Sequence, residues 1–323
     1  MKHSRRRFLR FVATAGTLTA VPRVVLAQSY PSRPVHWIVG FTPGGASDIF
    51  ARLIGQRLSN RLGQQLIVEN RPGAGTNMAT EAVVRAAPDG YTLLLSSPAN
   101  AINATLYDKL NFNFIEDIAP VASLARAPNV MVVSSAFSAK TIPEFIAYAK
   151  ANKINMASSG VGASSHLSGE LLKMMAGIDM VHVPYRGAPQ ALTDLLRGEV
   201  QVMFSTVPPA IEYVKAGRLR AMAVTTTTRL EALPDVPSIS EFVPGYEASA
   251  WWGVGAPKHT PAAIIDRLNT EINACLVDPD MKARFVDLGV TPLIGSPHDF
   301  GRLLVEETEK WGRVVKFAGL RPA

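Results

Sequence analysis

Cysteine is almost absent from this chain, because Cys275 is the single one among 323 residues. One thiol cannot form an internal disulfide, so the fold cannot depend on disulfide cross-links. The apolar neighbours Ile272 and Leu276 predict that Cys275 lies on a helix beside the core. We therefore interpret Cys275 as a small buried hydrophobe and not as a catalytic thiol.

Charged and aromatic residues are also few, at 18% and 7% of the chain, and no block of like charges occurs. Hydrophobic residues make up 47%, which is typical of a globular protein and excludes an intrinsically disordered one. A length of 323 residues fits about two domains.

The net charge of +7 does not indicate a nucleic-acid partner. Residues 1–27 hold six of the lysines and arginines and no acidic residue, so residues 28–323 contain 27 basic and 26 acidic side chains. A nearly neutral chain offers no surface for a phosphate backbone, and we expect no nucleic-acid binding.

The first 27 residues have the pattern of an export signal. The segment Ser4–Arg10 matches the twin-arginine pattern, and a mild apolar stretch follows up to Leu26. That stretch contains Pro22 and Arg23 and is too short for a membrane span. We expect cleavage after Ala27 and a soluble, periplasmic mature protein.

Short apolar runs alternate with amphipathic stretches along the rest of the chain. This alternation predicts an α/β fold with parallel sheets covered by helices. In such sheets ligands bind at the carboxyl ends of the strands. The expected strands are 35–39, 66–68, 92–95, 130–133, 180–183, 200–204 and 219–224.

Several helix starts carry recognisable caps. Thr141 and Glu144 have the spacing of a capping box, and Thr260 and Ser296 each precede a proline at a first helical position. Long helical stretches after Thr260 bring few strands with them and need a sheet elsewhere in the chain. We therefore expect two interleaved domains, residues 28–127 with 227–323 and residues 128–226.

Five phrases in the chain resemble those of one receptor family. They are Phe41–Asp48, Glu69–Gly75, Ala87–Leu93, Val181–Gly187 and Leu233–Pro237. In this order they resemble the Bug family, the extracytoplasmic solute receptors of tripartite tricarboxylate transporters. The likeness runs from about residue 34 to residue 311.

The resemblance implies a periplasmic-binding-protein fold with two α/β domains and a ligand cleft between them. It also implies a receptor in which loops from both domains hold a small carboxylate that is passed to membrane transporter subunits. We expect a monomer without a cofactor, a metal or a catalytic residue.

The loop after the first expected strand is one candidate ligand loop, with Phe41, Gly44, Gly45, Ser47 and Asp48. Glycine lets the backbone come close to a ligand, and the following helix offers free N–H groups and the positive end of its dipole. An anion site is therefore expected here, and a plain tight turn is the alternative.

A serine- and glycine-rich loop, residues 158–166, is the second candidate. Ser164 or Ser165 can cap the helix that follows, and the next N–H groups then face the cleft. His166 either contacts the ligand or packs against the protein, and the sequence leaves both open.

Further candidate ligand residues lie at other strand ends. Arg186 could hold a carboxylate with two hydrogen bonds, although a surface arginine is the alternative. Small hydroxyl donors end another strand. The candidates in these places are Ser96, Ser97, Asn100, Tyr185, Arg186 and Gly187.

Ser205 departs from the resembled family, in which many members have an aspartate at this place. A serine gives a ligand ammonium no counter-charge, so burial of an ammonium there would be costly. We therefore expect a carboxylate without a free amino group, such as an aromatic acid or a dicarboxylate. Alternatively, residue 205 only supports its loop.

An enzyme is the main competing class, since Ser165 stands beside His166. Adjacent residues rarely form a nucleophile–base pair, and the chain has no Gly-x-Ser-x-Gly elbow. The histidines after residue 27 show no metal-ligand spacing. A receptor that presents its ligand to a membrane signalling partner would use the same fold, and the sequence does not separate it from a transport receptor.

Overall fold

The computed structural model describes residues 30–317 and 319–322, so the predicted export signal at residues 1–27 lies outside the described residues. The strands are β1 (Val35–Val39), β2 (Leu66–Asn70), β3 (Thr92–Ser96), β4 (Ile118–Ser134), β5 (Asn155–Ser158), β6 (Val181–Pro184), β7 (Val202–Thr206), β8 (Leu219–Val224), β9 (Ser249–Pro257) and β10 (Thr291–Pro292).

Helices cover the sheet on both faces, and two short 3-10 helices lie in loops. The α-helices are α1 (Ala46–Leu62), α2 (Asn77–Val84), α3 (Pro98–Leu106), α4 (Phe114–Asp117), α5 (Ile142–Ala151), α6 (Ser164–Ala176), α7 (Ala188–Arg197), α8 (Val207–Lys215), α9 (Ala262–Val277), α10 (Pro279–Asp287) and α11 (Pro297–Phe317). The 3-10 helices are η2 (Ala74–Thr76) and η3 (Ile239–Glu241).

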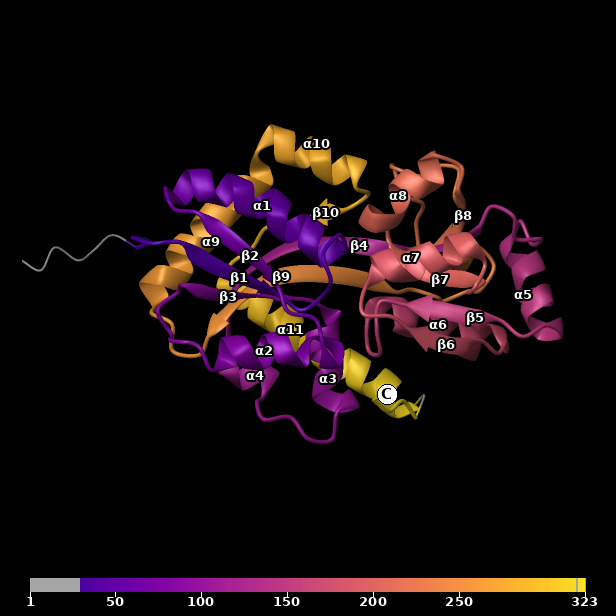
Figure 1. Ribbon diagram of the computed structural model, residues 1–323, viewed down its shortest axis with the longest axis horizontal. Coiled ribbons are helices and arrows are strands. Elements are labelled where there is room, and N and C mark those ends of the chain that lie inside the picture. The colour runs from indigo at the N-terminus through magenta and orange to yellow at the C-terminus, as the bar shows by residue number, and fades with distance from the viewer. Residues whose placement is uncertain (1–29, 318, 323) are drawn as a thin grey trace, which may run out of the picture.

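The strands form one curved sheet in the order β2-β1-β3-β9-β4-β7-β5-β6, with β8 and β10 also paired to β4. β1 runs parallel to β2 and β3, and β5 runs parallel to β6 and β7. These two parallel groups lie at opposite ends of the molecule, and the antiparallel strands β4 and β9 lie between them (Figure 1). We call the two ends the β1 lobe and the β5 lobe.

β4 belongs to both lobes. Residues 118–128 pair with β9, and residues 129–134 pair with β7 and β8. One long strand therefore carries the chain from the β1 lobe into the β5 lobe without a loop. The two lobes share a backbone connection at the middle of the sheet.

Each lobe has its own apolar core. The core of the β1 lobe contains Trp37, Phe50 and Trp252, packed under α1 and α9. The core of the β5 lobe contains Phe145 and Tyr246 under α5 and α6. Because aromatic and aliphatic side chains fill both interiors, each lobe buries enough apolar surface to be a packing unit.

Helix α11 is fixed to the β1 lobe by a buried carboxylate. Glu307 is 6% exposed and accepts hydrogen bonds from the indole nitrogens of Trp251, at 2.9 Å, and Trp311, at 2.7 Å. Both indole N–H groups therefore have partners in the interior, as buried polar groups require.

The α/β fold expected from the sequence is confirmed, and each of the seven expected strand runs overlaps a strand, although β6 begins one residue and β7 two residues later than expected. The sequence reading missed β5, β9, β10 and the first half of β4. β9 is buried along its whole length, so it lacks the alternation of apolar and polar residues that marks a half-exposed strand.

Two of the three predicted helix caps are confirmed. The backbone N–H of Glu144 donates to Thr141 Oγ1 at 3.3 Å, but the Glu144 carboxylate accepts from the N–H of Lys140 at 2.7 Å, so the return bond of a capping box does not form. Ser296 accepts from the first turn of α11. The prediction for Thr260 is wrong, because its hydroxyl donates to the carbonyl of Pro257 at 2.7 Å and α9 begins after Pro261. The Thr260 hydroxyl therefore bonds within the loop before α9 and does not cap the helix.

Cys275 lies on α9 with 2% of its surface exposed, so the expectation of a small buried hydrophobe is confirmed. Burial raises the pKa of its thiol to about 11, which keeps the sulfur protonated and unreactive near neutral pH. Among the described residues, no helix is both long and apolar enough to cross a membrane.

Candidate functional site

A cavity lies where the loops of the two lobes meet, at the carboxyl ends of several strands. About 480 Å³ between its lining residues is free of protein atoms, including space that is open to solvent. The lining residues are Phe41, Gly45, Ala46, Ser47, Ser97, Pro98, Ala99, Ser159, Ala163, Ser164, Ser165, Ala188, Thr206, Ala250 and Trp252. We call this space the lobe cavity.

No charged side chain is among the residues that line the lobe cavity. Instead, the first turns of α1, α3, α6 and α7 contribute to its wall, and α8 begins directly after the lining residue Thr206. The first N–H groups of a helix have no partner within the helix and lie at the positive end of its dipole. The cavity therefore favours a small anion without offering it a counter-ion.

The loop after β1 is held by a buried carboxylate. Asp48 is 4% exposed and accepts hydrogen bonds from the N–H of Gly44, at 2.9 Å, and from Arg52 Nε, at 3.0 Å. Burial alone would raise the pKa of Asp48, but hydrogen bonds from Arg52 and Gly44 outweigh it and lower that pKa. Asp48 does not line the lobe cavity. As a charged carboxylate, it holds the loop in place through these hydrogen bonds.

The two glycines of this loop have different roles. Gly44 has a φ of +79°, which an L side chain rarely adopts, whereas Gly45 has a φ of −77° and lines the lobe cavity. Asn70 supports the loop from β2, because its Nδ2 donates to the carbonyl of Phe41 at 3.0 Å. The turn thus brings the backbone of Gly45 directly to the cavity.

Trp252 and Ser47 form a part of the wall that the sequence did not reveal. The indole nitrogen of Trp252 donates to Ser47 Oγ at 3.0 Å, and its ring packs against Phe50 with centroids 4.5 Å apart. Because the Ser47 oxygen accepts from Trp252, its own proton is free to be donated to a ligand. The apolar run 250–256, which contains Trp251 and Trp252, was the available signal for this strand.

At the end of β3, Ser97 lines the lobe cavity, but Ser96 and Asn100 do not. Asn100 accepts from the N–H of Ser97 at 2.8 Å, and its Nδ2 donates to Thr80 Oγ1 at 2.8 Å. Asn100 therefore holds Ser97 in place. Ser96 is fully buried, and its hydroxyl has no partner among the described residues.

In the loop after β5, Ser164 and Ser165 line the lobe cavity as expected, but neither caps α6. The cap position is Ala163, because the helix begins one residue earlier than a serine cap requires. Ser165 Oγ instead accepts from the N–H of Ser159 at 3.0 Å. The hydroxyl thus closes the loop on itself.

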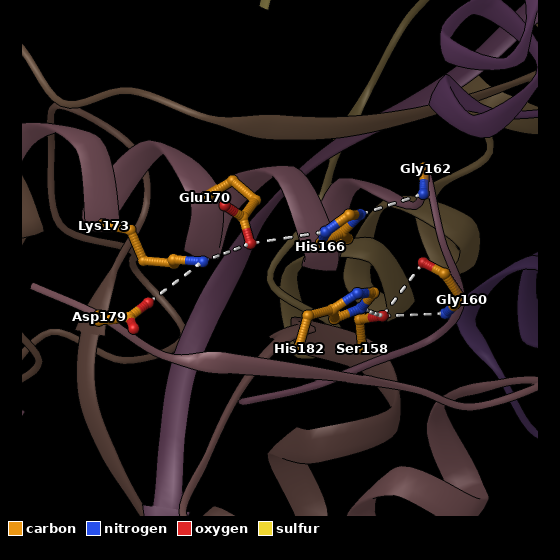
Figure 2. A network of polar contacts seen from close by, with 8 residues as sticks. All are labelled: Ser158, Gly160, Gly162, His166, Glu170, Lys173, Asp179 and His182. Atoms are coloured by element: carbon orange, nitrogen blue, oxygen red, sulfur yellow. Dashed lines mark hydrogen bonds and ion pairs between the residues drawn. The ribbon is translucent and has the colours of Figure 1, made fainter. Parts of the chain in front are cut away.

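His166 faces the loop and does not line the lobe cavity. Its Nδ1 accepts a hydrogen bond from the N–H of Gly162 at 3.2 Å. Its ring stacks on that of His182, with centroids 3.6 Å apart and an angle of 8° (Figure 2). Ser165 and His166 therefore bond to separate loop N–H groups, and neither is the partner of the other.

Tyr185 and Arg186 line a second cavity next to the first, with about 690 Å³ free of protein atoms, including space that is open to solvent. Phe41 and Ser159 are shared by the walls of both cavities. Tyr185 donates its hydroxyl to Asp194 Oδ2 at 2.8 Å, and burial together with this carboxylate raises the pKa of Tyr185 to about 12.

Gly187 lies where the two lobes touch. A Cβ at Gly187 would come within 1.9 Å of Thr42 Oγ1 from the loop after β1. Ser205 is fully buried in β7, and its hydroxyl donates to the carbonyl of Thr206 at 2.9 Å. Thr206, and not Ser205, belongs to the cavity wall.

Comparisons with known proteins agree on one family. A family model described as "Tripartite tricarboxylate transporter family receptor" matches residues 50–320. Protein BugT of Bordetella pertussis is 35% identical over 316 residues, which cover 96% of both chains.

Two solved structures with named ligands are similar to the whole lobe arrangement. "R. palustris Rpa4515 with adipate" has a TM-score of 0.88 and 36% identity, covering 91% of this chain and 100% of that chain. MatC from Rhodopseudomonas palustris, with bound malate, has a TM-score of 0.84 and 32% identity, covering 88% of this chain and 100% of that chain.

Proposed function

The chain belongs to the receptor family of tripartite tricarboxylate transporters, and on this premise we propose that it captures a small carboxylate and delivers it to a membrane transporter. The observation that carries the proposal is the lobe cavity, in which helix starts from both lobes converge and no charged side chain is present. A carboxylate gains from these N–H groups without a fixed counter-ion.

The known ligands of similar proteins support this chemical class. Two proteins of the same fold and about one-third identity were solved with adipate and with malate, both carboxylates. The hydroxyls of Ser47, Ser97, Ser164 and Ser165 around the lobe cavity suit carboxylate oxygens as further donors.

We further propose that the two lobes close on the ligand in the periplasm as hinged domains. The chain crosses between lobes within β4, near residues 128–129. Residues 230–246 pack against the β5 lobe, so we place the return crossing at Ser249 and not near Thr226. The export signal at residues 1–27 stays a prediction.

The ligand is proposed to carry no ammonium group. No acidic side chain lines the lobe cavity, and the buried carboxylate of Asp48, next to the lining residue Ser47, is occupied by Arg52 and Gly44. An ammonium would lose its water there without gaining a negative partner. Calorimetry with succinate and aspartate, which differ in the amino group, tests this, and tighter binding of aspartate would contradict it.

A native mass spectrum of protein purified without denaturation tests the proposed function, followed by calorimetry with benzoate, adipate, malate and succinate. We expect one bound carboxylate per chain, recovered chemically unchanged, with micromolar affinity or better for at least one acid (about −8 kcal/mol). Turnover of the bound acid would show an enzyme, and no binding by any acid would refute the receptor.

A further inference from the structure

Two histidines stack beneath the ligand loop of the β5 lobe. His166 comes from the first turn of α6 and His182 from the edge strand β6, and the rings lie parallel at 3.6 Å (Figure 2). His166 is only 4% exposed. Neither ring lines the lobe cavity, so this pair lies behind the wall and not in it.

Each ring holds one part of the loop. His166 Nδ1 accepts from the N–H of Gly162 at 3.2 Å, and His182 Nε2 lies 2.6 Å from Ser158 Oγ. Ser158 Oγ in turn accepts from the N–H of Gly160 at 3.2 Å. The stacked pair therefore connects to both ends of the turn that leads to Ala163.

The bond from Gly162 fixes the protonation of His166. An imidazole nitrogen that accepts an N–H has no proton of its own, so in His166 the proton is on Nε2. That nitrogen lies 3.6 Å from Glu170 Oε1. If Nδ1 took up a second proton, the N–H of Gly162 would face another N–H and the hydrogen bond would be lost.

The charged groups that face the pair come from α6 and the loop after it. Glu170 lies between His166 and Lys173, and Lys173 also reaches Asp179. β5 contributes the neutral hydroxyl of Ser158, and the other lobe contributes neutral and apolar side chains of α3 against Gly162. Glu170 is therefore the carboxylate that would stabilise a cation on His166.

The environment of His182 disfavours a positive charge on this second ring. Burial, with a smaller contribution from the neighbouring His166, lowers the pKa of His182 to about 3. Two parallel rings at this distance cannot both be charged at modest cost. Of the two rings, His166 is the one with a carboxylate at hand, because its Nε2 lies 3.6 Å from Glu170 Oε1.

We propose that His166 and His182 are positioning residues that hold residues 159–163 in the ligand-binding conformation, and that protonation of His166 releases this segment and weakens carboxylate binding in acid. The proposal rests on the proposed function for its effect on binding. Gly162 also packs against α3 of the β1 lobe, where a Cβ would meet Leu106 at 3.0 Å. Release of the segment therefore also disturbs the contact between the lobes.

The first test needs no ligand. The backbone amide signal of Gly162 is followed by nuclear magnetic resonance from about pH 7.5 to about pH 5.5, across the ordinary range of histidine. We expect it to shift in acid and to lose protection from solvent exchange, measured relative to a free peptide amide at the same pH. In His166→Asn the amide oxygen replaces Nδ1 as an acceptor that cannot take up a proton, so the change is expected to disappear. A Gly162 amide that titrates equally in both proteins would overturn the proposal.

The second test measures adipate binding by calorimetry at the same two pH values. Loss of one loop hydrogen bond predicts about fivefold weaker binding in acid for the unsubstituted protein. The ratio between the two pH values is expected to fall to about one in His166→Asn, while His166→Ala binds weakly at both. Adipate itself titrates in the same way in every experiment, so the difference between the variants reports only the contribution of the protein.

His298→Asn is the matched control, because His298 is an exposed histidine on α11 of the other lobe. It should keep the full pH dependence. If this control loses the dependence, or if His166→Asn keeps it, the assignment to the stacked pair is wrong. Failure of adipate to bind at any pH would count against the proposed function alone, because the Gly162 amide still tests the pair.

Discussion

The two ligand loops are held by anchors of different chemistry. In the β1 lobe, the carboxylate of Asp48 accepts from Gly44 and Arg52, and its pKa is lowered. In the β5 lobe, the neutral imidazoles of His166 and His182 hold the loop. A carboxylate stays charged through the whole neutral and mildly acidic range, whereas an imidazole changes charge within it.

This difference assigns separate tasks to the lobes. The loop of the β1 lobe is expected to keep its shape at any physiological pH, so it can serve as the fixed half of the site. The loop of the β5 lobe depends on one neutral tautomer and is the half that responds to conditions. The predictions below test this contrast from its largest expected consequence to its smallest.

The fixed half is tested most strongly by Gly45→Val. A Cβ at Gly45 would meet only the carbonyl oxygen of Thr42 at 3.5 Å, an ordinary contact, so the variant should fold. Its branched side chain would occupy the lobe cavity and block the backbone from the ligand. We expect affinity to fall by at least about a hundredfold, measured by calorimetry, with an unchanged melting temperature.

Gly55→Ala, on the buried face of α1, the helix that follows Gly45, is the control for Gly45→Val. A Cβ there would meet Leu66 at 3.6 Å, outside the cavity, so binding should not change. Normal binding by Gly45→Val would show that the carboxylate lies elsewhere. It would also remove the reason to call the β1 loop a ligand loop.

Closure of the responsive half on the fixed half is tested by Gly187→Ala. The new methyl group would lie 1.9 Å from Thr42 Oγ1, and Thr42 Cβ and its backbone nitrogen are close behind it. Because Gly187 and Thr42 belong to different lobes, the clash disfavours the arrangement in which these loops touch, and we expect about tenfold weaker binding. Small-angle scattering with ligand should show less compaction than in the unsubstituted protein, and an equal compaction would contradict the clamp.

The anchors themselves differ in the pH range over which they affect folding. The pKa of His182 is lowered to about 3, so the unfolded chain binds its proton first as the pH falls below about 6.5. Stability is therefore lost from about pH 6.5 downwards, by at most about 1.4 kcal/mol per pH unit, and by less where solvent screens the ring. In His182→Gln, urea unfolding should show a flatter slope in this range.

Asp48 should lose its contribution in a separate, more acidic pH window. Its folded pKa is lower than the ordinary value of 3.8, so its contribution is complete above that value and is lost as the pH falls below it. Asp48→Asn is expected to cost about 1–2 kcal/mol at neutral pH and to leave the slope between about pH 6.5 and about pH 4.5 unchanged. An altered slope there would mean that the two anchors do not differ as described.

Much of this comparison could be predicted from the sequence, and some could not. The turn at Gly44 and Gly45 was predicted because a strand, two glycines and a helix are consecutive in the chain. The wall at Trp252 was missed because β9 is buried throughout and pairs with strands far away in sequence. The stack of His166 on His182 needs the first turn of α6 to come close to β6, which no local pattern indicates.

The roles of individual site residues divide in the same way. Residue types predicted Ser164 and Ser165 at the cavity, since loop serines at a helix start suit an anion. The sequence did not show that Ser165 accepts a hydrogen bond from Ser159. A serine at this place either caps α6 or bonds within the loop, and a shift of one residue in the start of the helix decides which. Long-range packing settles such choices of partner, and a single sequence contains little information on it.

The smallest effect is expected from Arg186→Ala. Arg186 is the one candidate with a full charge that could meet a carboxylate directly, yet it is exposed and lines the second cavity and not the first. Helix starts around the lobe cavity share the work of holding the anion, and an exposed cation is screened by solvent. We therefore expect a change below about threefold in the affinity for a monocarboxylate such as benzoate. Phe41 and Ser159 line both cavities, so we expect a longer dicarboxylate to place its second acid group nearer Arg186 and to lose more affinity. Calorimetry of Arg186→Ala with benzoate and with adipate distinguishes these cases. A loss above tenfold with benzoate would show that a charge in the β5 lobe, and not its loop backbone, holds the carboxylate.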